Sequence, residues 1–305
     1  MILKVDRLPY ELPKPTEADP NAAAAVQELL GGKFGEMSTL MNYTYQSFNF
    51  RGKDKLRPYY DLISSIGGEE YGHIEIVSAA INLLHDGPRE DGDADGLDPT
   101  NAPFEAYKGV RNTQSFIVGG GSALVQDSMG KPWNGDNVFA SGNLMLDLTH
   151  NFFLESGARL HKLRVYEMTS NPVAREMIGY LLVRGGVHQL AYAKALETLS
   201  GVEIPKMLPM PNIPTAKIPE SKKLIDRGEH CKLYRFSETD FLTLAATWNG
   251  THPEDGKPLV VADEPMPSGA TKPSLADMTS GFVPDYAPEE VLEISQKLMK
   301  KAQGF

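Results

Sequence analysis

Glu70 and His73 form the most informative pair of polar residues in this sequence. They lie three residues apart in the stretch EEYGHIE, inside a segment whose apolar residues recur with helical period. Alternate steps of four and three residues along 59–84 pass through both positions, which places them on a face that packs against neighbouring helices. A carboxylate on such a face must protonate, pair with a cation or bind a metal. Glu69 and Glu75 fall off this face and are expected to be solvated.

Three other helical segments carry polar residues at matching positions. The same stepping passes through Glu36, Glu155 and His188, each near the middle of its segment. Together with Glu70 and His73 they resemble the ligand pattern of a ferritin-like dinuclear metal bundle, in which two helices supply a Glu each and two supply a Glu-x-x-His each. Three carboxylates and two imidazoles favour manganese or iron over a thiophilic metal.

Gly185 stands where that pattern expects a fourth carboxylate. A glycine inside a helix costs roughly 1 kcal/mol relative to alanine, so we expect close packing or open space beside the metals. Lys162 and Tyr43 each follow a predicted ligand by seven residues, which places them on the same face two turns along. We expect Lys162 near Glu155 and Tyr43 near Glu36, as catalytic groups that tune the ligands and move protons. An ordinary core tyrosine is the alternative for Tyr43.

Other residues imitate the ligand spacing without sharing its register. Asp147 and His150 lie three residues apart, but both miss the face that carries Glu155. We expect them at the surface or behind the ligands. The four remaining histidines lie in loops or off these faces and are assigned no role: His85, His161, His230 and His252.

The segments that position these residues are predicted to be four long helices. Asp19-Pro20 and Asn171-Pro172 are typical helix starts, each a capping side chain followed by proline at the first helical position. A long crossover rich in Asp, Gly and Pro separates the second helix from the third. The predicted class is therefore all-α, a ferritin-like four-helix bundle, with helices over residues 19–51, 56–84, 142–168 and 171–201.

The character of the chain changes after Gly201. The stretch VEIPKMLPMPNIPTAKIPE contains five prolines, and little helical period follows until the amphipathic segment PEEVLEISQKLMKKA near the end. We predict two parts. Residues 1–201 form an N-terminal arm and the metal-binding bundle, and residues 202–305 form an extended, mostly irregular tail that wraps the bundle or a neighbouring subunit. A small independent C-terminal domain is the alternative.

Composition narrows the functional classes. A net charge of −10 over 305 residues argues against nucleic acid or an anionic membrane as partner, because both would repel the average surface. One cysteine, Cys231, excludes an intramolecular disulfide and a multi-thiolate metal site. No apolar run reaches the roughly 18 residues of a membrane-spanning helix, and the N-terminus lacks the pattern of a signal peptide. We expect a cytoplasmic protein.

With this ligand set, the chain resembles the manganese (non-haem) catalases along nearly its whole length. The resemblance rests on GGKFGEMSTLMNYTYQSFNFRG, GGEEYGHIE, NFFLESGARLHKLRVYEMT and NPVAREMIGYLLVRGGVHQLAYAKALE. It implies that the metal ligands are Glu36, Glu70, His73, Glu155 and His188, with Tyr43 behind them. Some members place an Arg and a further Glu where this chain has Leu154 and Gly185. Lys162 fits the branch in which a lysine serves instead.

The resemblance also implies a reaction and an assembly. Two manganese ions per chain, with a bridging oxide or hydroxide, would alternate between Mn(II)2 and Mn(III)2 and convert hydrogen peroxide to water and dioxygen. Glu70 would bridge the ions, each imidazole would bind one, and Lys162 would handle protons. A homohexamer is implied. Some members hold a structural calcium, for which Asp61 matches one position, whereas Ser65 replaces a second acid.

Two alternatives remain open from the residues. A di-iron oxidase or ferroxidase uses the same bundle, but it normally requires a carboxylate where Gly185 stands. A non-catalytic coat or shell protein with a vestigial site is the other, and the intact ligand set argues against it. The choice of manganese over iron does not follow from the ligand types alone.

Overall fold

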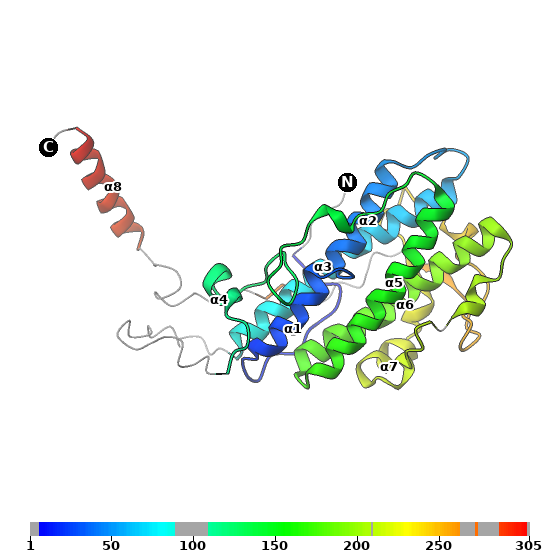
Figure 1. Ribbon diagram of the computed structural model, residues 1–305, viewed down its shortest axis with the longest axis horizontal. Helices are drawn as coiled ribbons and strands as arrows, with labels where there is room; N and C mark the ends of the chain where they lie inside the picture. The colour runs from blue at the N-terminus through cyan, green and yellow to red at the C-terminus, as the bar shows by residue number, and fades with distance from the viewer. Residues whose placement is uncertain (1–5, 89–108, 209, 263–271, 274–286, 304–305) are drawn as a thin grey trace.

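A bundle of long helices forms the body of the protein (Figure 1). The computed structural model describes residues 6–88, 109–208, 210–262, 272–273 and 287–303. Its long helices are α1 (Pro20–Gly31), α2 (Glu36–Phe48), α3 (Arg57–Asp86), α5 (Leu144–Met168) and α6 (Pro172–Ser200). The predicted all-α ferritin-like class is confirmed. Helices α1 and α2 together take the place of the first of the four predicted helices.

The first predicted helix, over residues 19–51, is wrong in one respect, because it is broken between Gly32 and Gly35. A Cβ atom added at Gly32 would lie 2.3 Å from the backbone oxygen of Glu28, and one at Gly35 would lie 2.7 Å from that of Leu30. Side chains have no room where the chain turns this tightly. Glycine therefore allows the break that ends α1 and starts α2 at Glu36.

Capping residues explain where the other helices begin. The side chain of Asp19 accepts a hydrogen bond from the Ala22 N–H, and that of Asn171 accepts one from the Val173 N–H, each followed by proline at the first helical position. These contacts satisfy backbone donors that lack a partner within the helix. At the other end of α6, Gly201 has a φ of 73°, a left-handed conformation that glycine adopts at little cost.

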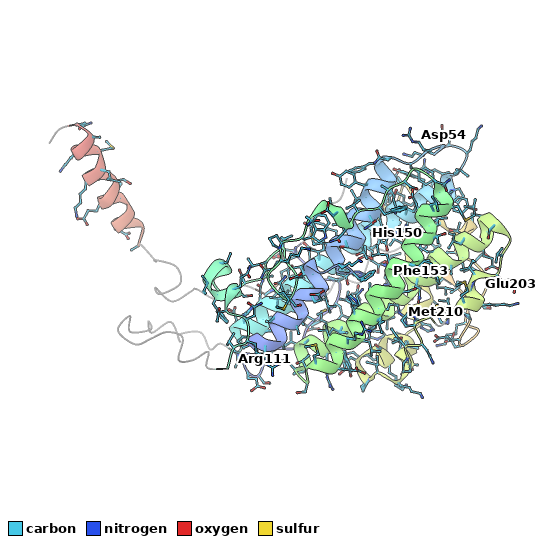
Figure 2. All side chains as sticks on the ribbon, viewed as in Figure 1. Asp54, Arg111, His150, Phe153, Glu203 and Met210 are labelled. Atoms are coloured by element: carbon cyan, nitrogen blue, oxygen red, sulfur yellow. The ribbon has the colours of Figure 1, made fainter. Side chains whose placement is uncertain are left out.

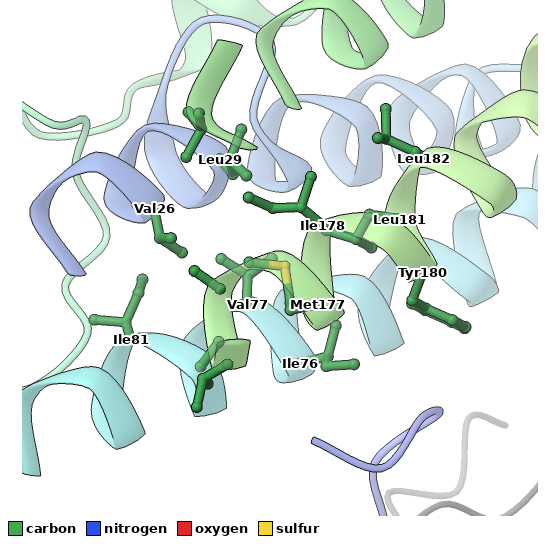
Figure 3. Packing of buried hydrophobic residues seen from close by; sticks show 14 of the residues in the cluster. Val26, Leu29, Ile76, Val77, Ile81, Met177, Ile178, Tyr180, Leu181 and Leu182 are labelled. Atoms are coloured by element: carbon green, nitrogen blue, oxygen red, sulfur yellow. The ribbon is translucent and has the colours of Figure 1, made fainter. Parts of the chain in front are cut away.

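Apolar packing divides the bundle core into two clusters. In the first, α1, α3 and α6 interdigitate, as Figure 3 shows for Val26, Leu29, Ile76, Val77, Met177 and Ile178. The second lies toward the other end and includes Ile63, Leu148, Leu190 and Trp248. Tyr43 belongs to this second cluster and is fully buried. The polar residues of the bundle lie between two apolar regions that exclude water.

The remaining elements cover this bundle. The crossover contains α4 (Gln114–Gly119), and the segment after α6 contains α7 (Pro219–Asp226) packed on α6. Strands β1 (Lys232–Tyr234) and β2 (Val260–Ala262) form a parallel pair with Leu233 opposite Val261. Short 3₁₀ turns occur at Gly135–Asn137, Ile204–Met207, Thr215–Lys217, Glu229–Cys231 and Leu244–Ala246. The described residues between 202 and 262 thus contain only short helices, turns and strands, as expected for a mostly irregular segment.

The last helix, α8 (Pro288–Ala302), is drawn apart from the bundle in Figure 1. It matches the predicted amphipathic segment, and its Leu292, Leu298 and Met299 are exposed. Much of the segment before it, residues 263–271 and 274–286, lies outside the described residues. The division at residue 201 and the wrapping of a neighbouring subunit stay predictions.

Among the described residues, no helix is both long and apolar enough to cross a membrane.

Candidate metal centre

The five predicted metal ligands converge in the middle of the bundle. Glu36 is the first residue of α2, Glu70 and His73 lie on α3, Glu155 lies on α5 and His188 on α6. Each has at most 1% of its surface exposed. A solvated charge cluster is therefore excluded for these residues, and the helical spacing that predicted a shared interior face is correct.

Glu70 occupies the centre of the group. Its Oε1 lies 2.7 Å from His188 Nδ1, and its Oε2 lies 3.2 Å from His73 Nδ1. Ligand atoms of the three residues all lie within 4.8 Å of one another. The two outer carboxylates flank them, with Glu36 Oε2 3.6 Å from His73 Nδ1 and Glu155 Oε1 3.4 Å from His188 Nδ1. Glu70 thus presents one oxygen to each imidazole, as a bridging ligand requires.

Several buried nitrogen and oxygen atoms in this group have no hydrogen-bond partner among the described residues. They include Glu155 Oε2, His73 Nε2 and both ring nitrogens of His188. His188 approaches carboxylate oxygens closely but is not aligned for hydrogen bonds. Buried polar atoms without partners are costly. Imidazole nitrogens and carboxylate oxygens that cluster with few hydrogen bonds to one another are arranged as ligands around a cation would be. The residues therefore fit the metal that the sequence pattern predicts.

The carboxylates also control protonation of the imidazoles. Burial lowers the pKa of His73, but Glu70, Glu36 and Glu69 outweigh it and raise that pKa to about 10. The pKa of His188 is raised well above its usual value, because Glu69, Glu155 and Glu70 outweigh burial in the same way. A cation at this centre therefore replaces protons, since an imidazole binds a metal only in its neutral form.

Lys162 and Tyr43 both contact predicted ligands, but the partners are exchanged. Lys162 was expected near Glu155 and contacts Glu36, whereas Tyr43 was expected near Glu36 and contacts Glu155. Lys162 Nζ lies 2.8 Å from Glu36 Oε1, and the hydroxyl of Tyr43 donates to Glu155 Oε1 at 2.6 Å. Seven residues along a helix correspond to a rise of about 10 Å, too far for contact with the ligand on the same helix. Each side chain therefore reaches across the bundle.

Both side chains are buried and their pKa values shift accordingly. Burial lowers the pKa of Lys162, but Glu36, Glu155 and Glu70 outweigh it and raise the pKa above its usual value. The pKa of the Tyr43 hydroxyl is raised well above its usual value by burial and by the charge of Glu155. At neutral pH the site thus contains a buried ammonium and a protonated phenol, each in contact with a predicted ligand.

Gly185 provides the close packing predicted for it. A Cβ atom at this position would lie 3.3 Å from Arg159 Cγ, 3.6 Å from Lys162 Nζ and 3.7 Å from Glu155 Oε2. The Lys162 ammonium thus occupies space into which a longer side chain at Gly185 would extend. The glycine at 185 therefore leaves room for the buried lysine, where a carboxylate side chain would compete for the same space.

Glu69 was predicted to be solvated, and this prediction is wrong. Its side chain is 1% exposed, and its oxygens lie 2.5 and 3.0 Å from Nε and Nη2 of Arg184. The same two oxygens face His73 Nε2 at 3.6 Å and His188 Nε2 at 3.0 Å. Although burial opposes ionisation, Arg184 and His188 hold the pKa of Glu69 well below its usual value. One carboxylate therefore orients both imidazoles from behind.

The burial of Glu69 could have been inferred from its partner Arg184, a basic residue inside an apolar helix. Arg184 interrupts the run GYLLVRGG on α6, and a buried guanidinium requires an acid nearby. It also donates to the backbone oxygens of Glu229 and Lys232, which anchors the segment after α7 to the bundle. Glu75 is partly buried rather than fully solvated, and it pairs with Lys272 at 2.5 Å.

The residues that imitate the ligand spacing lie elsewhere. Asp147 is a buried acceptor for the N–H and hydroxyl of Ser141, and the ring of His150 stacks on Phe139 at 4.8 Å. Figure 2 shows His150 on α5. Both were expected at the surface or behind the ligands, and neither belongs to the cluster around Glu70.

Two other groups with ligand-type side chains are engaged by protein donors. Asp61 pairs with Arg57 at 2.6 Å and accepts from the Thr243 hydroxyl at 2.7 Å, while Ser65 donates to a backbone oxygen. His230, Cys231 and Asp255 lie within 4.8 Å of one another, but Asp255 already accepts from His230 and Lys257. We assign the His230 group no metal, and a cation at Asp61 would have to displace the Arg57 and Thr243 contacts.

Known proteins resemble this chain in sequence and in fold. The family described as "Manganese containing catalase" matches residues 1–304. A manganese catalase of Bacillus subtilis is 38% identical over 200 residues, which cover 64% of this chain and 71% of that protein. One of Lactiplantibacillus plantarum is 38% identical over 196 residues, covering 63% and 71%.

A solved structure shares the fold. It is a manganese catalase from Anabaena, with a TM-score of 0.54 and 22% sequence identity, and the match covers 87% of this chain and all of that one. The family match spans almost every residue, including the five predicted ligands and the helices that carry them. This chain therefore belongs to the manganese-containing catalase family.

Proposed function

We propose that this protein disproportionates hydrogen peroxide to water and dioxygen at a centre of two manganese ions. The observation that carries the proposal is the position of Glu70, which offers one oxygen to each of two imidazoles between two flanking carboxylates. Such a set holds two ions side by side. Family membership supports manganese as the metal and peroxide as the substrate.

The ligands fall into two symmetric halves around Glu70. Glu36 and His73 would hold one ion, and Glu155 and His188 the other. The ions, with a bridging oxide or hydroxide, would alternate between divalent and trivalent states and so exchange two electrons with each peroxide molecule. Because each of these residues is at most 1% exposed, only a small molecule reaches the centre.

The groups around the ligands move and hold protons. Lys162 keeps its proton in the buried site because of Glu36, and it donates a hydrogen bond or a proton to peroxide oxygen as the O–O bond breaks. Tyr43 holds Glu155 in place through its hydroxyl. Glu69 lies behind the outer nitrogens of both imidazoles, at 3.6 and 3.0 Å, and would fix the orientation of the rings.

Gly185 distinguishes this proposal from the ferroxidase alternative. A di-iron oxidase of this fold normally places a fourth carboxylate there. Here a side chain at that position would approach the Lys162 ammonium, which is 3.6 Å from the site of a Cβ atom. A cation in place of an anion makes the pocket less suited to collecting ferrous ions.

Metal reconstitution with an oxygen electrode tests the proposal. Metal-free protein is loaded with manganese or with iron, its metal content is measured, and peroxide is added. Oxygen release should scale with manganese content in the absence of haem. Oxidation of ferrous ions without oxygen release would favour the ferroxidase, and full manganese loading without oxygen release would favour a vestigial site.

We also propose that the protein is a cytoplasmic homohexamer, as the family resemblance implies. Light scattering of the purified protein measures its mass directly. A structural calcium at Asp61 is a weaker proposal, because both carboxylate oxygens already accept from Arg57 and Thr243. Metal analysis after dialysis against a calcium chelator tests it.

A further inference from the structure

A cavity of about 530 Å³ lies on the outer side of α6, away from the metal ligands. Residues 9–13 of the N-terminal arm, α6 and α7 form its walls. The rings of Tyr10, Tyr180 and Tyr234 line it, together with apolar side chains of the arm. Its volume is within the usual range for a small-molecule site. The question is which kind of molecule the lining suits.

The lining of this cavity contains three acids and three bases: Glu11, Glu176, Glu229, Arg184, Lys223 and Arg227. Arg184 is held by Glu69, and Lys223 forms an ion pair with Glu176. Tyr10 donates a hydrogen bond to the same Glu176, and Tyr234 donates one to Glu229. Because acids and bases balance in this lining, the cavity suits a neutral molecule that packs against aromatic rings.

A continuous line of rings connects the cavity to the metal site. The ring of Tyr180 meets the His73 imidazole edge-on, with centroids 5.9 Å apart and planes at 90°. On its other side Tyr180 stacks on Tyr10, with centroids 5.2 Å apart and planes at 14°. Figure 3 shows Tyr180 at the margin of the apolar cluster of α1, α3 and α6. Electron tunnelling slows steeply with the gap between π systems, so rings in contact form a favourable route.

The outer end of this line has an acceptor for a proton. Oxidation of a phenol is favourable only when its proton leaves with the electron. Tyr10 is partly exposed, and its hydroxyl already donates to the Glu176 carboxylate. Tyr180 is 5% exposed and lies between Tyr10 and the ligand. Tyr10 is therefore the ring at which oxidation is expected to stop, and Tyr180 is the bridge to it.

We propose that His73, Tyr180 and Tyr10 form a path by which a neutral phenolic reductant in the cavity delivers single electrons to the metal site. The proposal rests on the proposed peroxide chemistry, which supplies the oxidant. One electron leaves Tyr10 through Tyr180 and His73 while its proton passes to Glu176. A phenol in the cavity then gives one hydrogen atom to the Tyr10 radical and leaves as a phenoxyl radical. Glu176 releases its proton to solvent, and one proton is taken up where peroxide is reduced.

Two such transfers balance the reduction of one peroxide. Two phenols lose two electrons and two protons, and hydrogen peroxide takes up both to become two water molecules. Two phenols and one hydrogen peroxide thus give two phenoxyl radicals and two water molecules. The activity is a peroxidase side reaction, which would also return the site to its reduced state when an oxidised form is left without a second peroxide.

Radical trapping with peptide mass spectrometry tests this path independently of turnover. Manganese-loaded protein is mixed with peroxide and the spin trap 2-methyl-2-nitrosopropane, and tyrosine adducts are located. We expect an adduct on Tyr10 that is lost in Tyr180→Leu and in Glu176→Gln. Adding guaiacol should suppress the adduct and produce coloured oxidation product, and Tyr10→Phe should lose that product.

Tyr166→Phe is the matched control. Tyr166 also donates its hydroxyl to a glutamate, Glu220 at 2.8 Å, but its ring lies against Arg175 rather than on the path. This variant should keep the Tyr10 adduct. Manganese content is measured for every variant, and Glu176→Gln decides the question if Tyr180→Leu fails to fold.

The other outcomes would overturn the proposal. A Tyr10 adduct of equal yield in metal-free protein, or one unchanged in both Tyr180→Leu and Glu176→Gln, would show oxidation from solution. Oxygen release without any Tyr10 adduct would reject the path and leave the proposed catalase function standing. Absence of both oxygen and adduct in fully loaded protein would reject the proposed function, and the path with it.

Discussion

Replacement of Glu69 by glutamine is the sharpest test of how the site is held together. The substitution keeps the shape of the side chain but removes its charge and turns one acceptor oxygen into an N–H donor. Four nitrogens surround this carboxylate, two from the Arg184 guanidinium and one each from His73 and His188. At least one of them would then face another donor.

The expected loss follows from burial. Both partners of the Arg184–Glu69 pair are 1% exposed, so the guanidinium would stay buried without its counter-charge. Removal of one partner of such a pair costs about 3–5 kcal/mol of the free energy of unfolding. Loss of a group that orients ligand imidazoles typically weakens metal binding about 10–100-fold. Glu69→Gln should therefore reduce both the stability and the manganese affinity.

Denaturant unfolding of the metal-free protein and metal titration measure the two effects separately. Glu75→Gln is the matched control, because Glu75 lies on the same helix but pairs with Lys272 at a partly exposed position. That change should cost less than about 1 kcal/mol and leave metal affinity unchanged. If Glu69→Gln resembled Glu75→Gln in both measurements, Glu69 would have no part in orienting the ligands.

Three further predictions concern the ligands and their protons. His73→Ala or His188→Ala should remove most bound manganese, because each proposed ion would have a single imidazole ligand. Full occupancy by elemental analysis would mean that the ligands are wrongly assigned. Lys162→Met should keep the metals but lower kcat by about 10²-fold, the usual size of a lost proton-transfer group; unchanged kcat at full loading would make the lysine structural. Manganese affinity should rise with pH up to about 10, the raised pKa of His73, because below that pKa the imidazole must release a proton before it binds. Calorimetry in buffers of different ionisation enthalpy counts the protons released, and a pH-independent affinity would contradict the reasoning.

The shared interior face of the five proposed ligands could be predicted from sequence because helical periodicity is a local property. Residues three, four and seven apart share a face whatever the helix packs against. The ligand positions on α3, α5 and α6 therefore followed from spacing alone. Glu36 also lies on the predicted interior face, although the prediction assumed one continuous helix where the chain is interrupted at Gly32–Gly35.

The contacts around the ligands depend on the packing of whole helices, which spacing does not provide. Lys162 and Tyr43 were placed on the correct faces, but their partners were exchanged because contact across the bundle depends on the axial offset between helices. Glu69 was missed for another reason. Steps of four and three residues mark only one side of a helix as buried. Helix α3 contacts α1, α2, α6 and β1, so it is buried on several sides.

The glycine break between α1 and α2 separates the register of the metal site from that of the preceding helix. A residue added to a continuous helix rotates everything beyond it by about 100°, which would turn a ligand out of the centre. Glu36 instead starts a helix of its own, and its orientation is set by the packing of α2 on α3. Sequence change in α1, including insertion or deletion, can thus be absorbed at Gly32–Gly35, which leaves α1 freer to diverge than the four helices that carry the proposed ligands and their partners.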